Sequence, residues 1–209
     1  MYKNSMKIFL MFTTTLLLFV GCSDRQGSQE KLIERAGAPL LSGLGNHSHE
    51  ITTKDPGAQK YFDQGLVLAF AFNHAESIRS FQAAQRLDPE CAMCFWGEAL
   101  SRGPNINVTS DGKVVMSGDD RVRAFVALNT AKRLSLRASK KEQDYIDALS
   151  TRYNGDVVTD RNNLDLDYAK AMEVLSKEYP NDMDAASLFA EYLMNTMPWN
   201  YWADDGNPR

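Results

Sequence analysis

Cys91 and Cys94, three positions apart, are the most reactive pair of side chains in the sequence. They follow the stretch LDPE, at the start of a predicted helix. Such a pair can form a disulfide, act as a redox couple because a helix N-terminus lowers the pKa of a thiol, or supply two thiolates to a metal. A c-type haem is excluded, because Phe95 stands where the attachment motif requires a histidine.

A metal site needs more ligands than two thiolates, and histidines are the obvious supplement. The sequence holds three of them, His47, His49 and His74. Together with Cys91 and Cys94 they form a candidate site for copper or zinc. The competing interpretation places His74 in a hairpin turn and His47 and His49 in a solvated linker. We therefore expect no cofactor, with copper or zinc as the alternative.

The rest of the sequence favours binding over catalysis. It contains no nucleophile elbow, no phosphate-binding glycine loop and no zincin helix, so we expect a protein that is not an enzyme. The net charge of −4 argues against nucleic acid as the main partner, because such binders concentrate lysine and arginine.

The N-terminus has the layout of an export signal. Lys3 and Lys7 precede the apolar run IFLMFTTTLLLFV, which is shorter than the roughly 20 residues that span a bilayer. Residues Phe19 to Cys22 resemble the bacterial lipobox, which implies removal of residues 1–21 and lipid modification of Cys22. By the same analogy Ser23 favours the outer membrane, facing the periplasm. Plain secretion is the alternative.

Export also bears on the cysteine pair, because disulfides form and persist outside the cytoplasm. The favoured state of Cys91 and Cys94 is therefore a disulfide. It would fix the turn after Pro89 and set how Phe95 and Trp96 enter the core. Redox activity, metal binding and free packed thiols remain open.

The spacing of apolar residues separates a segment without regular structure from a helical part of the chain. Residues 22–50 are polar and glycine-rich, and predict a flexible tether without a core of its own. Asp55-Pro56 then predicts the start of a helix over about 56–72, and a second amphipathic helix ends at Asp88-Pro89. Further helices are predicted over about 139–153, 164–179 and 182–196. The 103–118 stretch reads as a long inserted loop, and such loops are usually functional or mobile.

Residues 58–91 resemble one tetratricopeptide repeat (TPR), with Ser77 where the family usually has alanine. The matching positions are Tyr61, Gly65, Leu68, Phe81 and Ala84. The resemblance implies an all-α fold in which antiparallel helical hairpins stack as a short right-handed solenoid over 51–202. Residues 203–209 then read as an incomplete end, which suggests a fragment of a longer chain.

The runs YFDQG, FNHAES, RLDPECAMCFWGEAL and GPNIN also resemble a group of exported bacterial TPR lipoproteins that carry this cysteine pair. That resemblance implies no particular activity. Stacked hairpins create a concave groove, so the expected function is a membrane-anchored scaffold in the cell envelope that binds a protein or peptide. The groove-lining candidates, taken from the helical face, are Gln59, Asp63, Gln64, Glu98 and Arg102, with Asn105 and Asn107 at the start of the long loop. The alternative function is a periplasmic metal-handling or redox protein that uses the cysteine pair.

Overall fold

A computed structural model describes residues 27–155 and 161–209 of the chain. The chain divides into two compact units, residues 1–40 and 41–209. In the first unit the described part contains a short helix over residues 27–36. The predicted signal peptide and Cys22 lie outside the described residues.

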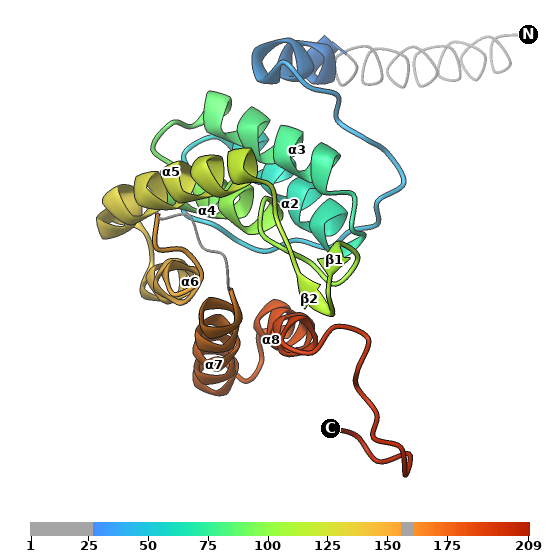
Figure 1. Cartoon of the computed structure of the whole chain (residues 1–209). Coiled ribbons are helices and arrows are strands. Elements are labelled where there is room, and N and C mark those ends of the chain that lie inside the picture. The colour runs from blue at the N-terminus through green and yellow to red at the C-terminus, as the bar shows by residue number, and fades with distance from the viewer. Residues whose placement is uncertain (1–26, 156–160) are drawn as a thin grey trace, which may run out of the picture. The chain divides into compact units, whose positions relative to one another are not determined.

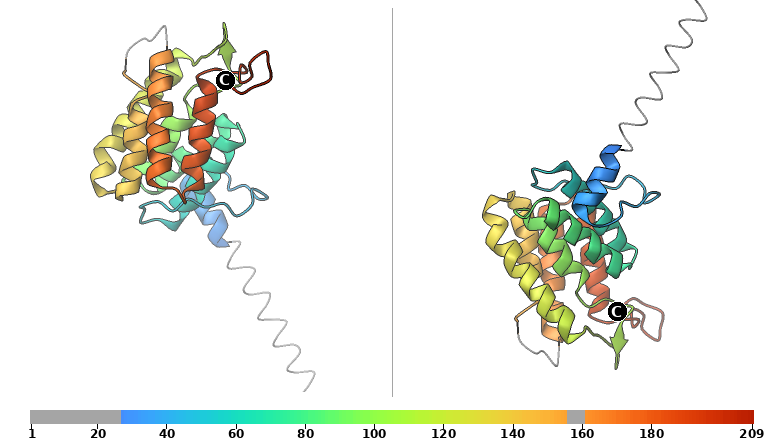
Figure 2. Two further views of the ribbon diagram at one scale, coloured as in Figure 1. Left: turned by 90° about the horizontal axis from the view of Figure 1, so that it is seen from below. Right: turned by 90° about the horizontal axis from the view of Figure 1, so that it is seen from above.

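The second unit is mostly helical, which confirms the expected all-α class (Figure 1). Each helix packs chiefly against its neighbours in sequence, and α4 also contacts α2 and α6. Both views in Figure 2 place the β1–β2 hairpin and the C-terminal residues at the same end of the helical array. The elements are α2 (Pro56–Phe70), α3 (His74–Leu87), α4 (Ala92–Ser101), β1 (Thr109–Ser110), β2 (Lys113–Val114), α5 (Gly118–Leu134), a 3₁₀ turn (Ser135–Arg137), α6 (Lys140–Ser150), α7 (Asn162–Glu178) and α8 (Met183–Asn195).

Side-chain caps set where several of these helices begin. Asp55 accepts a hydrogen bond from the backbone N–H of Gly57, and Pro56 occupies the first turn of α2, as the sequence predicts. The expected capping box of α6 is also present, formed by Ser139 and Glu142. At their other ends, α2 and α6 stop at Phe70 and Ser150, a few residues earlier than predicted.

Phe81 is the point at which α2, α3 and α4 pack together. Its ring is fully buried and lies against two glycines, Gly65 of α2 and Gly97 of α4. A Cβ atom placed on Gly65 would lie 2.9 Å from the ring, and one on Gly97 would lie 2.2 Å from it. Both glycines are therefore needed for the close approach of the three helices.

Ser77, the departure from the repeat pattern, also joins these three helices. Its hydroxyl donates to the backbone oxygen of Gly65 at 2.6 Å and lies 2.8 Å from the hydroxyl of Ser101. The serine replaces a small apolar contact with a buried hydrogen-bond network between α2, α3 and α4.

The 103–118 stretch, which the sequence predicts as a long inserted loop, has local structure of its own. It contains the short antiparallel hairpin β1–β2, in which Thr109 faces Val114 and Ser110 faces Lys113. The turn residues Asp111 and Gly112 have φ angles of 51° and 73°. A two-residue turn with positive φ at both positions is the turn for which Asp-Gly is favoured.

The predicted tether also differs from the structure, because residues 41–50 belong to the second unit and not to a separate linker. His49 is only 6% exposed and Ile51 only 7%. The polarity of this stretch suggested a solvated chain, but its polar groups are held by side chains from distant helices, as described below.

We expect the substitution Gly97→Ala to lower the free energy of unfolding by about 2 kcal/mol, because the added methyl group overlaps a ring that has no space to move. Urea unfolding followed by circular dichroism measures the change. The matched control is Gly118→Ala, where the nearest atom to an added Cβ is 3.7 Å away. An unfolding free energy for Gly97→Ala equal to that of the control would contradict the packing around Phe81.

Candidate functional site

An extended stretch of the chain lies against polar side chains of α2, where the sequence predicts a groove open to a partner. Residues 47–55, which we call the inner segment, run along α2 and reach α6 and α8. Burial along the segment alternates, with His49 and Ile51 inside and Ser48 and Glu50 outside. An extended chain has this period of two, so one side of the segment faces the helices and the other faces solvent.

Side chains of α2 hold the first half of the inner segment. The carboxylate of Asp63 accepts hydrogen bonds from the hydroxyl of Ser48 and the backbone N–H of His49, at 2.9 and 3.0 Å. The amide of Gln59 accepts from the N–H of Ile51 at 3.1 Å and donates to the carbonyl of His49 at 2.8 Å. Two of the expected groove-lining residues, Gln59 and Asp63, therefore bind the chain's own backbone.

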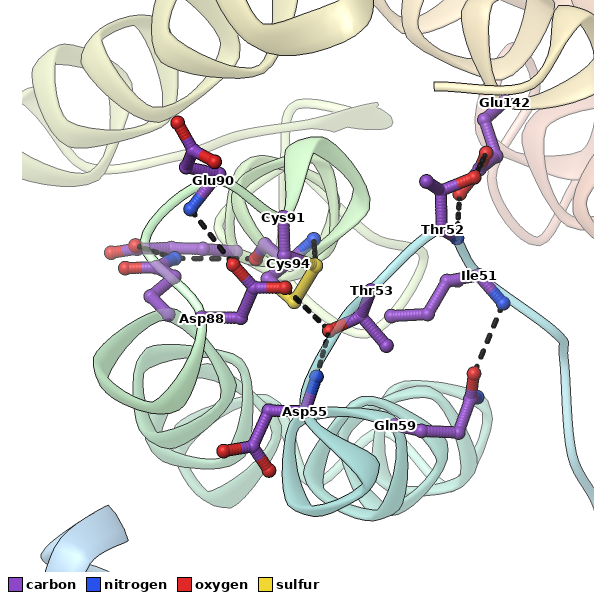
Figure 3. Close-up of a disulfide and its surroundings, with 12 residues drawn as sticks. Ile51, Thr52, Thr53, Asp55, Gln59, Asp88, Glu90, Cys91, Cys94 and Glu142 are labelled. Atoms are coloured by element: carbon purple, nitrogen blue, oxygen red, sulfur yellow. Dashed lines mark hydrogen bonds between the residues drawn. A yellow bond between two sulfur atoms is a disulfide. The ribbon is translucent and has the colours of Figure 1, made fainter. Parts of the chain in front are cut away.

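Carboxylates from α6 and from the end of α3 hold the second half (Figure 3). Both the N–H and the hydroxyl of Thr52 donate to Glu142, at 2.6 and 2.5 Å. The hydroxyl of Thr53 and the N–H of Lys54 donate to Asp88, at 2.6 and 3.1 Å. In Figure 3, Glu142 approaches the segment from the side opposite Gln59.

The other expected groove-lining residues are also engaged within the chain. Gln64 accepts from the N–H of Leu41 at 2.7 Å and donates to Ser80 at 2.9 Å. Glu98 forms a buried ion pair with Arg102 at 2.8 Å, and Arg102 reaches Asp120 of α5 at 3.0 Å. Glu98 and Arg102 also line a shallow groove between α4 and α5, and their role in binding a partner stays a prediction.

Asn105 and Asn107 lie where the chain leaves α4. The side-chain oxygen of Asn105 accepts from the backbone N–H of Asn107 at 3.0 Å, which shapes the turn. Asn105 is buried and Asn107 is exposed. The role of both residues in binding a partner stays a prediction.

Cys91 and Cys94 form a disulfide at the first turn of α4, and both residues are fully buried. Cys91 is the N-cap of α4, and its sulfur accepts a hydrogen bond from the N–H of Cys94 at 3.1 Å. Asp88 accepts from the N–H of Glu90 just before the pair, at 3.1 Å. The disulfide turn and the inner segment are therefore held by the same carboxylate.

The proposed copper or zinc site at the cysteines is not assembled. A disulfide has no thiolate for a metal. In addition, His74 begins α3 whereas Cys91 follows its other end, and a helix of 14 residues is about 21 Å long. Burial lowers the pKa of His74, and the charge of Arg152 lowers it further, so this histidine is neutral near pH 7.

His47 and His49 meet one carboxylate instead of the cysteines. Nε2 of His47 lies 3.0 Å from one oxygen of Asp184, and Nδ1 of His49 lies 2.7 Å from the other. The ring of His49 is flanked by Phe62 and Tyr145, with centroids 6.0 and 5.4 Å away. The prediction of a solvated linker is therefore wrong for His49, which is a core residue.

A cleft that the sequence did not indicate lies beside the β1–β2 hairpin. Its volume is about 600 Å³, and its walls come from the hairpin, the start of α5, the start of α7 and the end of α8. Arg121, Arg161, Asp165 and Asn195 line it. These residues are distant in sequence and belong to different helices, so no spacing pattern in the sequence predicts that they line one cleft.

Two buried guanidinium groups share one buried carboxylate here: Arg161 lines the cleft, whereas Arg152 is not part of its wall. Asp165 lies between two buried guanidinium groups, 3.4 Å from Arg161 and 3.7 Å from Arg152. Arg152 also stacks on Tyr192, 4.2 Å from its ring centroid. Burial lowers the pKa of the Arg161 guanidinium, opposed by the Asp165 carboxylate. One carboxylate therefore serves two cations.

Asn195, at the end of α8, is the most unusual polar group in this cleft. It is only 2% exposed, and neither atom of its amide has a hydrogen-bond partner among residues 27–155 and 161–209. A buried amide without partners costs free energy, and such groups call for a specific explanation.

Comparison with protein-family models, with curated proteins and with solved structures found no match for this chain. In the described part of the chain, no helix has the length and apolar character that crossing a membrane requires.

We expect the substitution Glu142→Ala to lower the free energy of unfolding by about 3 kcal/mol, because it removes the hydrogen bonds to Thr52 and the capping box of α6. Urea unfolding checks the stability. Limited proteolysis checks the release of the inner segment, which should be cleaved faster than in the wild type.

The exposed Glu178, on the neighbouring helix α7, provides the control Glu178→Ala. Equal cleavage of the inner segment in both variants would show that Glu142 does not hold it.

Proposed function

We propose that this chain is a helical scaffold of the bacterial cell envelope that binds a protein or peptide partner. In this proposal α2 to α8 form TPR-like hairpins that stack as a short right-handed solenoid. Three features support it: the helix order, the packing of consecutive helices and the small residues at the crossing around Phe81. Scaffolds of stacked hairpins commonly act as binding surfaces.

The partner would enter the cleft beside the β1–β2 hairpin and not the predicted groove along α2. The inner segment lies against α2, and its backbone uses the polar groups of Gln59, Asp63 and Glu142. The observation that carries the proposal is the unpartnered, buried amide of Asn195 in a cleft lined by arginines. A ligand that bonds to this amide would remove its desolvation cost.

The chemistry of the cleft favours a carboxylate of the partner, either an acidic side chain or a chain end. Arg121 and Arg161 supply positive charge, and an amide such as that of Asn195 can donate to a carboxylate oxygen. The cavity volume of about 600 Å³ falls in the usual range for ligand sites and suits a few residues of a peptide. No nucleic acid is expected as a partner.

The test is a binding screen with random-sequence peptides of two kinds, one with a free C-terminal carboxylate and one amidated. We expect the purified chain to select carboxylate-bearing peptides, and the variants Arg121→Glu and Asn195→Leu to weaken binding by about tenfold or more, measured by fluorescence anisotropy.

Arg133→Glu, an exposed charge reversal on the same helix as Arg121, is the matched control and should leave affinity unchanged. Equal selection of the amidated peptides, or equal loss in the control, would contradict recognition of a carboxylate in the cleft.

The envelope location rests on the lipobox-like sequence, and the proposed anchor is a lipid on Cys22 that holds the scaffold at the outer membrane, facing the periplasm. Substitution of Cys22 by alanine should abolish incorporation of labelled fatty acid and leave residues 1–21 uncleaved, because the lipobox resemblance ties both steps to this cysteine. Labelling in cells and the mass of the purified chain measure the two changes. A wild-type chain that incorporates no labelled fatty acid would rule out the lipid as the anchor.

A further inference from the structure

We propose that His47, His49 and Asp184 form a binding site for a divalent transition-metal ion of the zinc type, with Asp182 beside it. This site shares no ligand residue with the peptide cleft and does not depend on the proposed scaffold function. It differs from the cysteine site considered from the sequence, because it uses only nitrogen and oxygen ligands. Imidazole and carboxylate are both established zinc ligands.

The local backbone places the two histidines together. They are two positions apart in an extended segment, so both side chains lie on the same side of the chain. Asp184 reaches them from the first turn of α8, at 3.0 Å from Nε2 of His47 and 2.7 Å from Nδ1 of His49. Ligand atoms of tetrahedral zinc are about 3.3 Å apart, so both histidine–carboxylate distances are close to those that an ion requires.

A fourth candidate ligand lies close by. One oxygen of Asp182 and the ligand atoms of His49 and Asp184 all lie within 4.8 Å of one another. Lys141 already neutralises Asp182, with its ammonium group 3.0 Å from the carboxylate. We therefore assign the three direct protein ligands to His47, His49 and Asp184, and a water molecule to the open position.

The surroundings hold these ligands in place without help from the metal. The backbone N–H of His49 is bonded to Asp63, and its ring is enclosed by Phe62 and Tyr145. Nε2 of His49 is buried and has no hydrogen-bond partner in the described part of the chain, so packing alone sets the ring's orientation on that side. Asp63 and the two flanking rings therefore position His49 before an ion binds.

The site is also accessible. The side chain of His47 is 40% exposed, whereas that of His49 is only 5% exposed. The ion can therefore enter from the His47 side, and the water ligand would face solvent there. A bound ion would fasten the inner segment to α8 and so join the first and last parts of the second unit.

Zinc binding by the full chain, purified in detergent without reductant and with a tag that contains no histidine, tests the site. We expect one zinc ion per chain by equilibrium dialysis and elemental analysis. His47→Ala and Asp184→Asn should each weaken the affinity by about tenfold or more, measured by competition with a chromophoric chelator.

The matched control is His74→Ala, which removes a histidine far from Asp184 in sequence and should leave the affinity unchanged. Thermal unfolding gives a second readout: zinc should raise the melting temperature of the wild type and of His74→Ala, but not that of His47→Ala. Because His47 is partly exposed, its variant decides the question if Asp184→Asn does not fold. Absence of zinc at micromolar free concentration, undiminished binding by His47→Ala, or equal loss in His74→Ala would overturn the proposal.

Discussion

The structure depends on satisfying the polar backbone of the inner segment. Residues 47–55 form neither a helix nor a sheet, yet one side of the segment is enclosed by helices. Buried N–H groups without partners would destabilise the fold, and here carboxylates and an amide from α2, α6 and the end of α3 accept their hydrogen bonds. Three separate helical regions are thereby joined through a stretch of chain that has no regular structure of its own.

The inner segment bears on where the proposed partner would bind. Gln59, Asp63 and Glu142 already bind the chain's own backbone. The cleft beside the β1–β2 hairpin has a different character. Asp165 is placed against Arg152 and Arg161, and the Asn195 amide is unpartnered among the described residues. A buried excess of positive charge is costly, and a bound carboxylate would offset it.

The cysteine pair has a local structural role in this picture. A disulfide across only three positions constrains the unfolded chain little, so its contribution to stability is modest. Its position matters more, because it closes the first turn of α4. The residues just before it form a turn in which Asp88 accepts hydrogen bonds from the hydroxyl of Thr53 and the N–H of Glu90. The two histidines that sequence reasoning grouped with these cysteines lie instead against Asp184, at the other end of the sequence.

Local features of the fold could be predicted from the sequence, because they depend on neighbouring residues. The 3.6-residue period predicted the helices, Asp55 and Ser139 predicted two of their starts, and Gly65 and Phe81 indicated a close helix crossing. The Asp-Gly turn of the 103–118 stretch was also available as a signal, although its hairpin was not predicted. Only the tertiary structure decided which polar groups meet. His49 with Asp184, Thr52 with Glu142 and Arg152 with Asp165 are 135, 90 and 13 positions apart. Residue periodicity describes which face of an element is polar, but it does not specify which distant segment will cover that face.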